Sequence, residues 1–69
     1  MEEITQLLRE ERKRLGLTQE ELATIGGVKV NAQGVYERGL RTPNAIYLEN
    51  IANAGVDVLY VVTGRRVRD

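Results

Sequence analysis

The segment from Gly27 to Gly39, GVKVNAQGVYERG, carries side chains suited to binding rather than to catalysis. The carboxamide of Asn31 can pair with N6 and N7 of adenine, or it can be an ordinary solvated group. Lys29 can bind guanine or a phosphate, and the phosphate is favoured because phosphates and sugars accept half or more of such hydrogen bonds. Val30 and Val35 can contact thymine methyl groups or pack inside the protein. The segment is therefore a candidate for contacting the edges of DNA bases.

The residue types that the sequence lacks exclude most catalytic and metal sites. The chain contains no Cys, no His and no Ser. Disulfides, thiolate sites, the usual transition-metal ligand sets and Ser–His–Asp triads therefore cannot be built. We expect no enzymatic activity and no metal or other cofactor, and no effector pocket is evident in so short a chain.

Length and charge limit the protein further. Sixty-nine residues suffice for one domain with a small core. Ten basic and ten acidic residues give a net charge of zero, which argues mildly against a general nucleic-acid binder. The distribution of charge matters more than its sum, and the basic residues fall into three groups. These groups are Arg9 to Arg14, the pair Arg38 and Arg41, and Arg65 with Arg66 and Arg68.

Two of these basic groups have ordinary explanations. The group from Arg9 to Arg14 is better explained as a solvated helix face paired with Glu10 and Glu11 than as a phosphate-binding patch. Residues 65–69 are expected to form a flexible, basic, solubilising tail rather than an arm that reaches DNA.

The chain shows no targeting or membrane-spanning segment. Met1-Glu2-Glu3 is acidic, unlike the start of a signal peptide. The longest apolar run, Val58 to Val62, is far too short to cross a bilayer. The absence of Cys is compatible with a reducing cytoplasm, so we expect a cytoplasmic protein without a membrane partner.

Two helices are predicted in the first part of the chain. Over residues 3–15 apolar residues recur at helical spacing, and Gly16 follows them at a typical C-terminal position. Thr18 and Glu21 then match a capping box, which predicts a helix from Gln19 to about Ile25. Gly26 and Gly27 end that helix.

Two further helices are predicted in the second part. Thr42 suits an N-cap and Pro43 the first helical position of a helix whose inward face is Ala45, Leu48, Ile51 and Ala52. The run from Val58 to Val62 resembles a strand by propensity. An isolated strand needs a partner, so we favour a short helix between Asp57 and Gly64.

The region from Thr18 to Gly39 combines a capped helix, a glycine turn and a second helix over about residues 29–38. Small Ala23 permits close crossing of the two helices, and Gly27 permits a left-handed turn. Val28 and Tyr36 supply apolar contacts that hold the crossing angle. This is the arrangement of a helix-turn-helix, in which the second helix enters the major groove.

The sequence closely resembles the Cro/repressor-type, lambda-repressor-like helix-turn-helix family of phage and bacterial transcription regulators. The resemblance covers about residues 4–64, and the ending from Gly55 to Gly64 looks like the last helix of a bacterial and prophage subgroup. The motifs that carry it are Gly16-Leu-Thr-Gln-Glu-Glu-Leu-Ala23, Gly27-Val28, Tyr36-Glu-Arg-Gly39, Arg41-Thr-Pro43, Leu48 and Ile51-Ala52. It implies an all-α bundle of four to five helices over residues 1–64, with the helix-turn-helix at about 18–38. It also implies sequence-specific binding to double-stranded DNA, commonly as a homodimer on a palindromic operator.

The same resemblance assigns site residues. Base contacts would come from the exposed side of the second helix, from Lys29, Val30, Asn31, Gly34 and Val35. DNA backbone contacts would come from Thr18, Gln19, Arg38 and Arg41. Gly34 costs its helix about 1 kcal/mol relative to Ala, and we expect it to permit close approach to the groove or to another helix.

Three features depart from the family pattern. Gln33 stands where many members have an apolar core residue, and Gly26 replaces a common Ala. Val30 and Val35 stand where many relatives have polar, base-reading side chains.

The run from Val58 to Val62 is also a candidate dimer surface. We expect Leu59 and Val62 to point inward and Val58, Tyr60 or Val61 to face a partner, because contiguous exposed apolar surface often marks an interface. A symmetric, isologous dimer is the default arrangement.

The function predicted from the sequence is a repressor that occludes a promoter. The alternative is a protein–protein adaptor, such as an antitoxin-like or anti-regulator module that uses the same fold.

Overall fold

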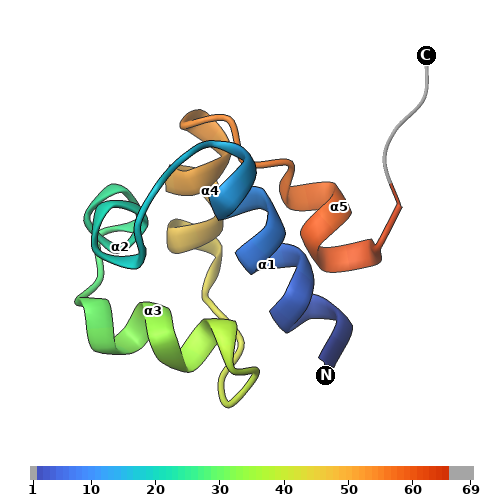
Figure 1. The fold of residues 1–69 in the computed structure, drawn as a ribbon, viewed down its shortest axis with the longest axis horizontal. Coiled ribbons are helices and arrows are strands. Elements are labelled where there is room, and N and C mark those ends of the chain that lie inside the picture. Colours follow the sequence, from blue (N-terminus) through green and yellow to red (C-terminus); the bar gives the residue numbers. More distant parts are fainter. Residues whose placement is uncertain (1, 66–69) are drawn as a thin grey trace.

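The computed structural model describes residues 2–65, and the side chains of residues 7–65. This part of the chain forms five helices, which confirms the predicted all-α fold (Figure 1). They are α1 (Glu2–Arg14), α2 (Gln19–Gly26), α3 (Val30–Glu37), α4 (Ala45–Asn53) and α5 (Val58–Thr63). Residues 66–69 of the predicted tail lie outside the described residues.

Local capping signals explain where α2 and α5 begin. The Thr18 hydroxyl accepts a hydrogen bond from the backbone N–H of Glu21 at 3.1 Å, and the Glu21 carboxylate accepts one from the Thr18 N–H at 2.8 Å. These two bonds form the predicted capping box. The Asp57 carboxylate accepts from the N–H of Tyr60 at 3.0 Å, so the run that follows is a helix and not a strand.

The predicted start of α4 is wrong by two residues. The N-cap is Asn44, whose side-chain oxygen accepts a hydrogen bond from the N–H of Tyr47 at 2.9 Å. Thr42 and Pro43 therefore precede the helix. Ile51 is buried and Leu48 packs against the core as predicted, but Tyr47 is also buried, whereas Ala45 and Ala52 are exposed.

The predicted orientation of α5 is also wrong. Val61 is only 2% exposed and belongs to the core, so it does not face a partner. Leu59 and Val62, which were expected inside, are 47% and 50% exposed. Residues three apart share a helix face, so Val58 packs against the core together with Val61.

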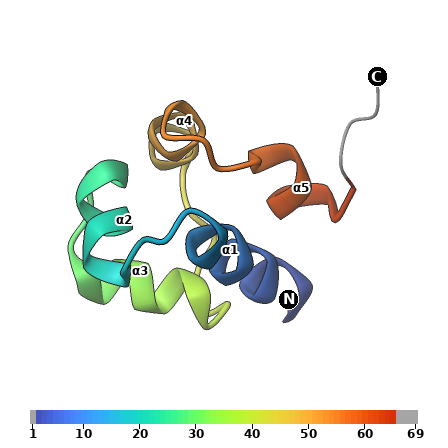
Figure 2. The same ribbon diagram turned by 45° about the horizontal axis from the view of Figure 1, so that its top comes forward.

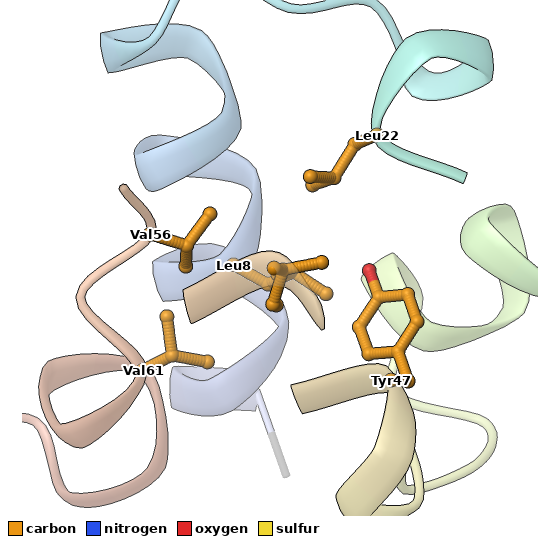
Figure 3. Packing of buried hydrophobic residues seen from close by; sticks show 6 residues of the cluster. Leu8, Leu22, Tyr47, Val56 and Val61 are labelled. Atoms are coloured by element: carbon orange, nitrogen blue, oxygen red, sulfur yellow. The ribbon is translucent and has the colours of Figure 1, made fainter. Parts of the chain in front are cut away.

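The helices pack around one small core. α1 lies against α3 and α5, and α2 lies against α3 and α4 (Figures 1 and 2). The buried cluster extends from Val56 and Val61 across Leu8 to Leu22 and Tyr47 (Figure 3), and it includes Ile51. No helix within residues 2–65 is long and apolar enough to span a bilayer.

Candidate nucleic-acid interface

The turn between α2 and α3 has the geometry that a helix-turn-helix needs. Gly27 adopts φ +81°, and its N–H donates to the Thr24 carbonyl at 3.2 Å. The N–H of Val28 donates to the Ala23 carbonyl at 2.9 Å, which completes a Schellman motif. Ala23 is buried, as the prediction of close helix crossing requires.

The first turn of α3 presents three of the predicted base-contacting residues to solvent. Lys29 is the N-cap residue, is exposed, and makes no side-chain capping bond. Val30 is 42% exposed and Asn31 is also exposed. In Figures 1 and 2, α3 lies at the margin of the fold. The start of α3 is therefore accessible to a ligand as large as DNA.

Gly34 and Val35 are less accessible than expected. Val35 is only partly exposed, and Gly34 is buried. A Cβ atom at Gly34 would lie 3.4 Å from Nη1 of Arg38, one turn later on the same helix. Among the described residues, the side chain of exposed Arg38 lies next to Gly34, and the burial of Gly34 differs from the exposed, groove-facing position that was predicted.

The predicted backbone-contacting residues flank α3 on the outside. Arg38 and Arg41 are exposed, and neither forms an ion pair with the described residues. Thr18 is exposed and Gln19 is partly exposed at the start of α2. Arg38 directly follows the last residue of α3, and Gln19 contacts that last residue, Glu37, so these two accessible side chains lie toward the C-terminal end of α3.

A buried carboxylate anchors the C-terminal end of α3. Oε2 of Glu37 accepts hydrogen bonds from Nε of Arg12 and from Nε2 of Gln33, both at 2.7 Å. Oε1 of Glu37 accepts from Nη2 of Arg12 at 3.0 Å and from Nε2 of Gln19 at 3.2 Å. One carboxylate thus joins α1, α2 and α3.

Gln33 extends this network to α4. Its side chain is 0% exposed, and its Oε1 accepts a hydrogen bond from the hydroxyl of Tyr47. Burial raises the pKa of the Tyr47 hydroxyl, so that group stays protonated and donates. The polar Gln33 is therefore accommodated in the core, where its Nε2 donates one hydrogen bond to Glu37 and its Oε1 accepts one from Tyr47.

The Glu37 carboxylate is charged in spite of its burial. Burial by itself raises the pKa of this carboxyl group, but hydrogen bonds from Arg12, Gln33 and Gln19 outweigh that effect. The net result is a Glu37 pKa below its ordinary value. The Arg12–Glu37 ion pair consequently persists at neutral pH.

The sequence interpretation missed this network. It treated Arg12 and Arg14 as members of one solvated basic group. Arg14 fits that description and forms an ion pair with Glu11 at 2.8 Å. Arg12 does not, because it is buried in an ion pair with Glu37. The available signal was the spacing of Gln33 and Glu37, which are four residues apart and share one helix face.

The chain matches known proteins over the segment that contains this geometry. The model of the helix-turn-helix family matches residues 8–54. A curated protein of Methanothermobacter thermautotrophicus is 48% identical over 48 residues, which cover 70% of each chain, and is described as an uncharacterized HTH-type transcriptional regulator. No solved structure matches the chain. The protein therefore belongs to the Cro/repressor-type helix-turn-helix family of DNA-binding transcription regulators.

Proposed function

We propose that the protein is a repressor that binds a palindromic operator as a homodimer, with α3 in the major groove. The observation that carries this proposal is the exposed start of α3, where Lys29, Val30 and Asn31 are accessible while Gln33 and Glu37, in the following turns, anchor the helix to the rest of the protein. Recognition helices contact base edges mainly through their N-terminal residues.

The exposed groups suggest a division of roles. Asn31 pairs with an adenine, and Val30 contacts a thymine methyl group. Lys29, Arg38 and Arg41 contact phosphates, assisted by the neutral donors Thr18 and Gln19. Because this set contains few cations, sequence discrimination depends on Asn31 more than on total charge.

The homodimer is supported by the exposed apolar residues of α5. Leu59 and Val62 are accessible, whereas Val58 and Val61 of the same helix pack against the core. A two-fold pairing of α5 would cover them and would relate two copies of α3 by the same symmetry as a palindromic site. We therefore propose the face of Leu59 and Val62, with part-buried Tyr60 beside it, as the dimer surface.

Selection from a random pool of duplex DNA tests the DNA-binding proposal. We expect enrichment of a palindromic site that contains adenine in each half. Asn31→Ala should weaken binding by about 1–3 kcal/mol per half-site and relax the preference at that adenine. Asn53→Ala, at an exposed position of α4, is the matched control and should bind like the wild type. If no sequence is enriched, the adaptor alternative replaces this proposal.

Light scattering tests the homodimer. We expect a dimer at tens of micromolar protein or on operator DNA, and Leu59→Glu should shift it to monomer. A protein that remains monomeric both free and on DNA would contradict the dimer.

A further inference from the structure

The Glu37 carboxylate is saturated with hydrogen-bond donors. A carboxylate has about four acceptor positions, and Glu37 fills them with two bonds from Arg12, one from Gln33 and one from Gln19. Arg12 and Gln33 are buried, whereas Gln19 is partly exposed. Gln19 is therefore the one member of this set that reaches from the buried network to the surface.

The amide of Gln19 has donor capacity left for a ligand. Its Nε2 carries two N–H groups, and one of them donates to Oε1 of Glu37 at 3.2 Å. Among the described residues the Gln19 side chain makes no other hydrogen bond. Phosphate oxygens accept hydrogen bonds from neutral amides as well as from cations, so the second N–H can donate to the DNA backbone.

We propose that Glu37 is a positioning residue for DNA binding, which fixes the Gln19 amide so that it donates its second N–H to one backbone phosphate. This inference rests on the proposed function. Glu37 is also the last residue of α3, so the same carboxylate couples Gln19, at the start of α2, to the helix that carries the base contacts. The backbone contact of α2 and the base contacts of α3 then form one rigid unit.

The ion pair with Arg12 makes this arrangement electrostatically possible. An unpaired carboxylate near a phosphate would repel it, but the Arg12 guanidinium binds Glu37 through Nε and Nη2 and compensates its charge. The remaining guanidinium nitrogen, Nη1, donates to the carbonyl of Leu17 at 3.0 Å, just before α2. Arg12 thus holds both ends of the Gln19–Glu37 contact in place.

A scan of the operator with neutral methylphosphonate groups tests the inference. For the wild type, replacing the phosphate that contacts Gln19 should weaken binding about tenfold in each half-site, as expected for loss of a hydrogen bond to a charged group. In Gln19→Ala, methylphosphonate replacement of that single phosphate should no longer weaken binding. In Glu37→Gln the sensitivity at the same phosphate should fall to about twofold or less, because the new amide group disturbs the set of donors. Glu49→Gln removes an exposed carboxylate of α4 and should retain the tenfold effect.

The outcomes separate this inference from the proposed function. If the wild type selects no DNA site, the proposed function fails and the positioning role fails with it. If DNA binds but no phosphate depends on Gln19, or if Glu37→Gln keeps the full effect at that phosphate, the positioning role alone is wrong. If Glu37 only stabilised the fold, Glu37→Gln would lower the thermal midpoint and leave the effect of methylphosphonate at that phosphate unchanged.

A measurement on the unmodified protein covers the case in which Glu37→Gln does not fold. In NMR spectra of the wild type, the Nε2 protons of Gln19 should exchange with water several-fold more slowly than the side-chain amide protons of exposed Asn53. Operator DNA should then shift the second Nε2 proton while the first stays bonded. Equal exchange at Gln19 and Asn53 would overturn the inference.

Discussion

Gly26 and Gly34 are both helical glycines, but the structure surrounds them differently. A Cβ atom at Gly26 would overlap Cδ2 and Cε2 of the buried Tyr47 ring. A Cβ atom at Gly34 would meet only Nη1 of Arg38 at 3.4 Å, which is ordinary contact with a flexible side chain. We therefore expect Gly26→Ala to lower the free energy of unfolding by about 1–3 kcal/mol through overpacking. Gly34→Ala should instead raise it by about 0.5–1 kcal/mol through helix propensity.

Urea denaturation of these two variants beside the wild type measures both effects. The two glycines serve as controls for each other, because the substitution is the same and only the surroundings differ. Stabilisation of both variants would contradict the packing seen around Tyr47, and destabilisation of both would contradict the open surroundings of Gly34.

The side chains of Gln33 and Tyr47 depend on each other. Tyr47→Phe removes the donor to Oε1 of Gln33, and Gln33→Leu leaves the Tyr47 hydroxyl buried without its acceptor. Each single change should cost about 1–3 kcal/mol, because it leaves an unsatisfied buried group. The double variant should cost less than the sum of the singles by about 1 kcal/mol or more, as measured by a denaturation cycle. Strict additivity would show that the bond contributes nothing.

These residues also connect two departures from the family pattern. Gly26 makes room for the ring of Tyr47, and the Tyr47 hydroxyl satisfies Gln33 in the core. Tyr36 of α3 packs edge-on against the same ring, with centroids 5.0 Å apart. A small residue at 26 and a polar residue at 33 are therefore consequences of one large side chain on α4.

At the scale of elements, α3 is a helix that tertiary contacts hold in place. Its sequence has a central glycine, its N-cap Lys29 makes no capping bond, and no acidic residue lies in its first turn. Its stability therefore depends on Glu37 and Gln33, which tie it to α1, α2 and α4. This coupling has a consequence for the response to acid.

We expect acid to destabilise the fold through Glu37. The pKa of this carboxyl group is lower in the folded protein than its ordinary value of 4.5. As pH falls, the unfolded chain therefore binds the proton before the folded protein does. The contribution of Glu37 to the free energy of unfolding is complete above about pH 4.5 and is lost as pH drops through the pKa of the folded protein. Urea midpoints between neutral pH and about pH 3 should fall less steeply for Glu37→Gln than for the wild type. Glu49→Gln should keep the wild-type slope, and equal slopes for all three proteins would contradict the assignment.

Elements with strong local signals were predictable, and those decided by packing were not. The capping box of Thr18 and Glu21, the left-handed Gly27 and the cap at Asp57 are encoded within a few residues, so α2, its turn and α5 were placed correctly. The start of α4 was misplaced because Asn44 competes with Thr42 and Pro43, which also suit a helix start. The face of α5 was inverted because Leu59, Val61 and Val62 are all apolar, and only packing against the rest of the bundle selects Val61 for the core.

The candidate site shows the same division. Lys29, Asn31, Arg38 and Arg41 could be identified from the sequence, and they are indeed exposed. The partner Arg12 of Glu37 could not be identified, because it lies 25 positions away in the chain and contacts Glu37 only after folding. A long-range buried ion pair leaves no periodic signal in one sequence.

At the scale of the whole molecule, the zero net charge conceals an uneven distribution. Two arginines are already paired within the fold, Arg12 with Glu37 and Arg14 with Glu11. Lys29, Arg38 and Arg41 remain exposed beside α3 without an ion pair among the described residues. Cations unpaired in the free protein gain most from a phosphate, so Lys29, Arg38 and Arg41 are available for phosphate contacts.

This distribution predicts the salt dependence of operator binding. We consider a plot of the logarithm of the association constant against the logarithm of salt concentration. Each neutralised phosphate contributes about −0.9 to its slope, so three phosphate-contacting cations in each of two protomers should give a slope of about −5. Arg41→Gln should make the slope shallower by about 2, one contact being lost per protomer. Arg9→Gln removes an exposed charge on α1 and should leave the slope unchanged, although the net charge of the chain changes equally. Fluorescence anisotropy with labelled operator at several salt concentrations measures these slopes. If the two variants shift the slope equally, binding would respond to the total charge of the protein rather than to the cations around α3.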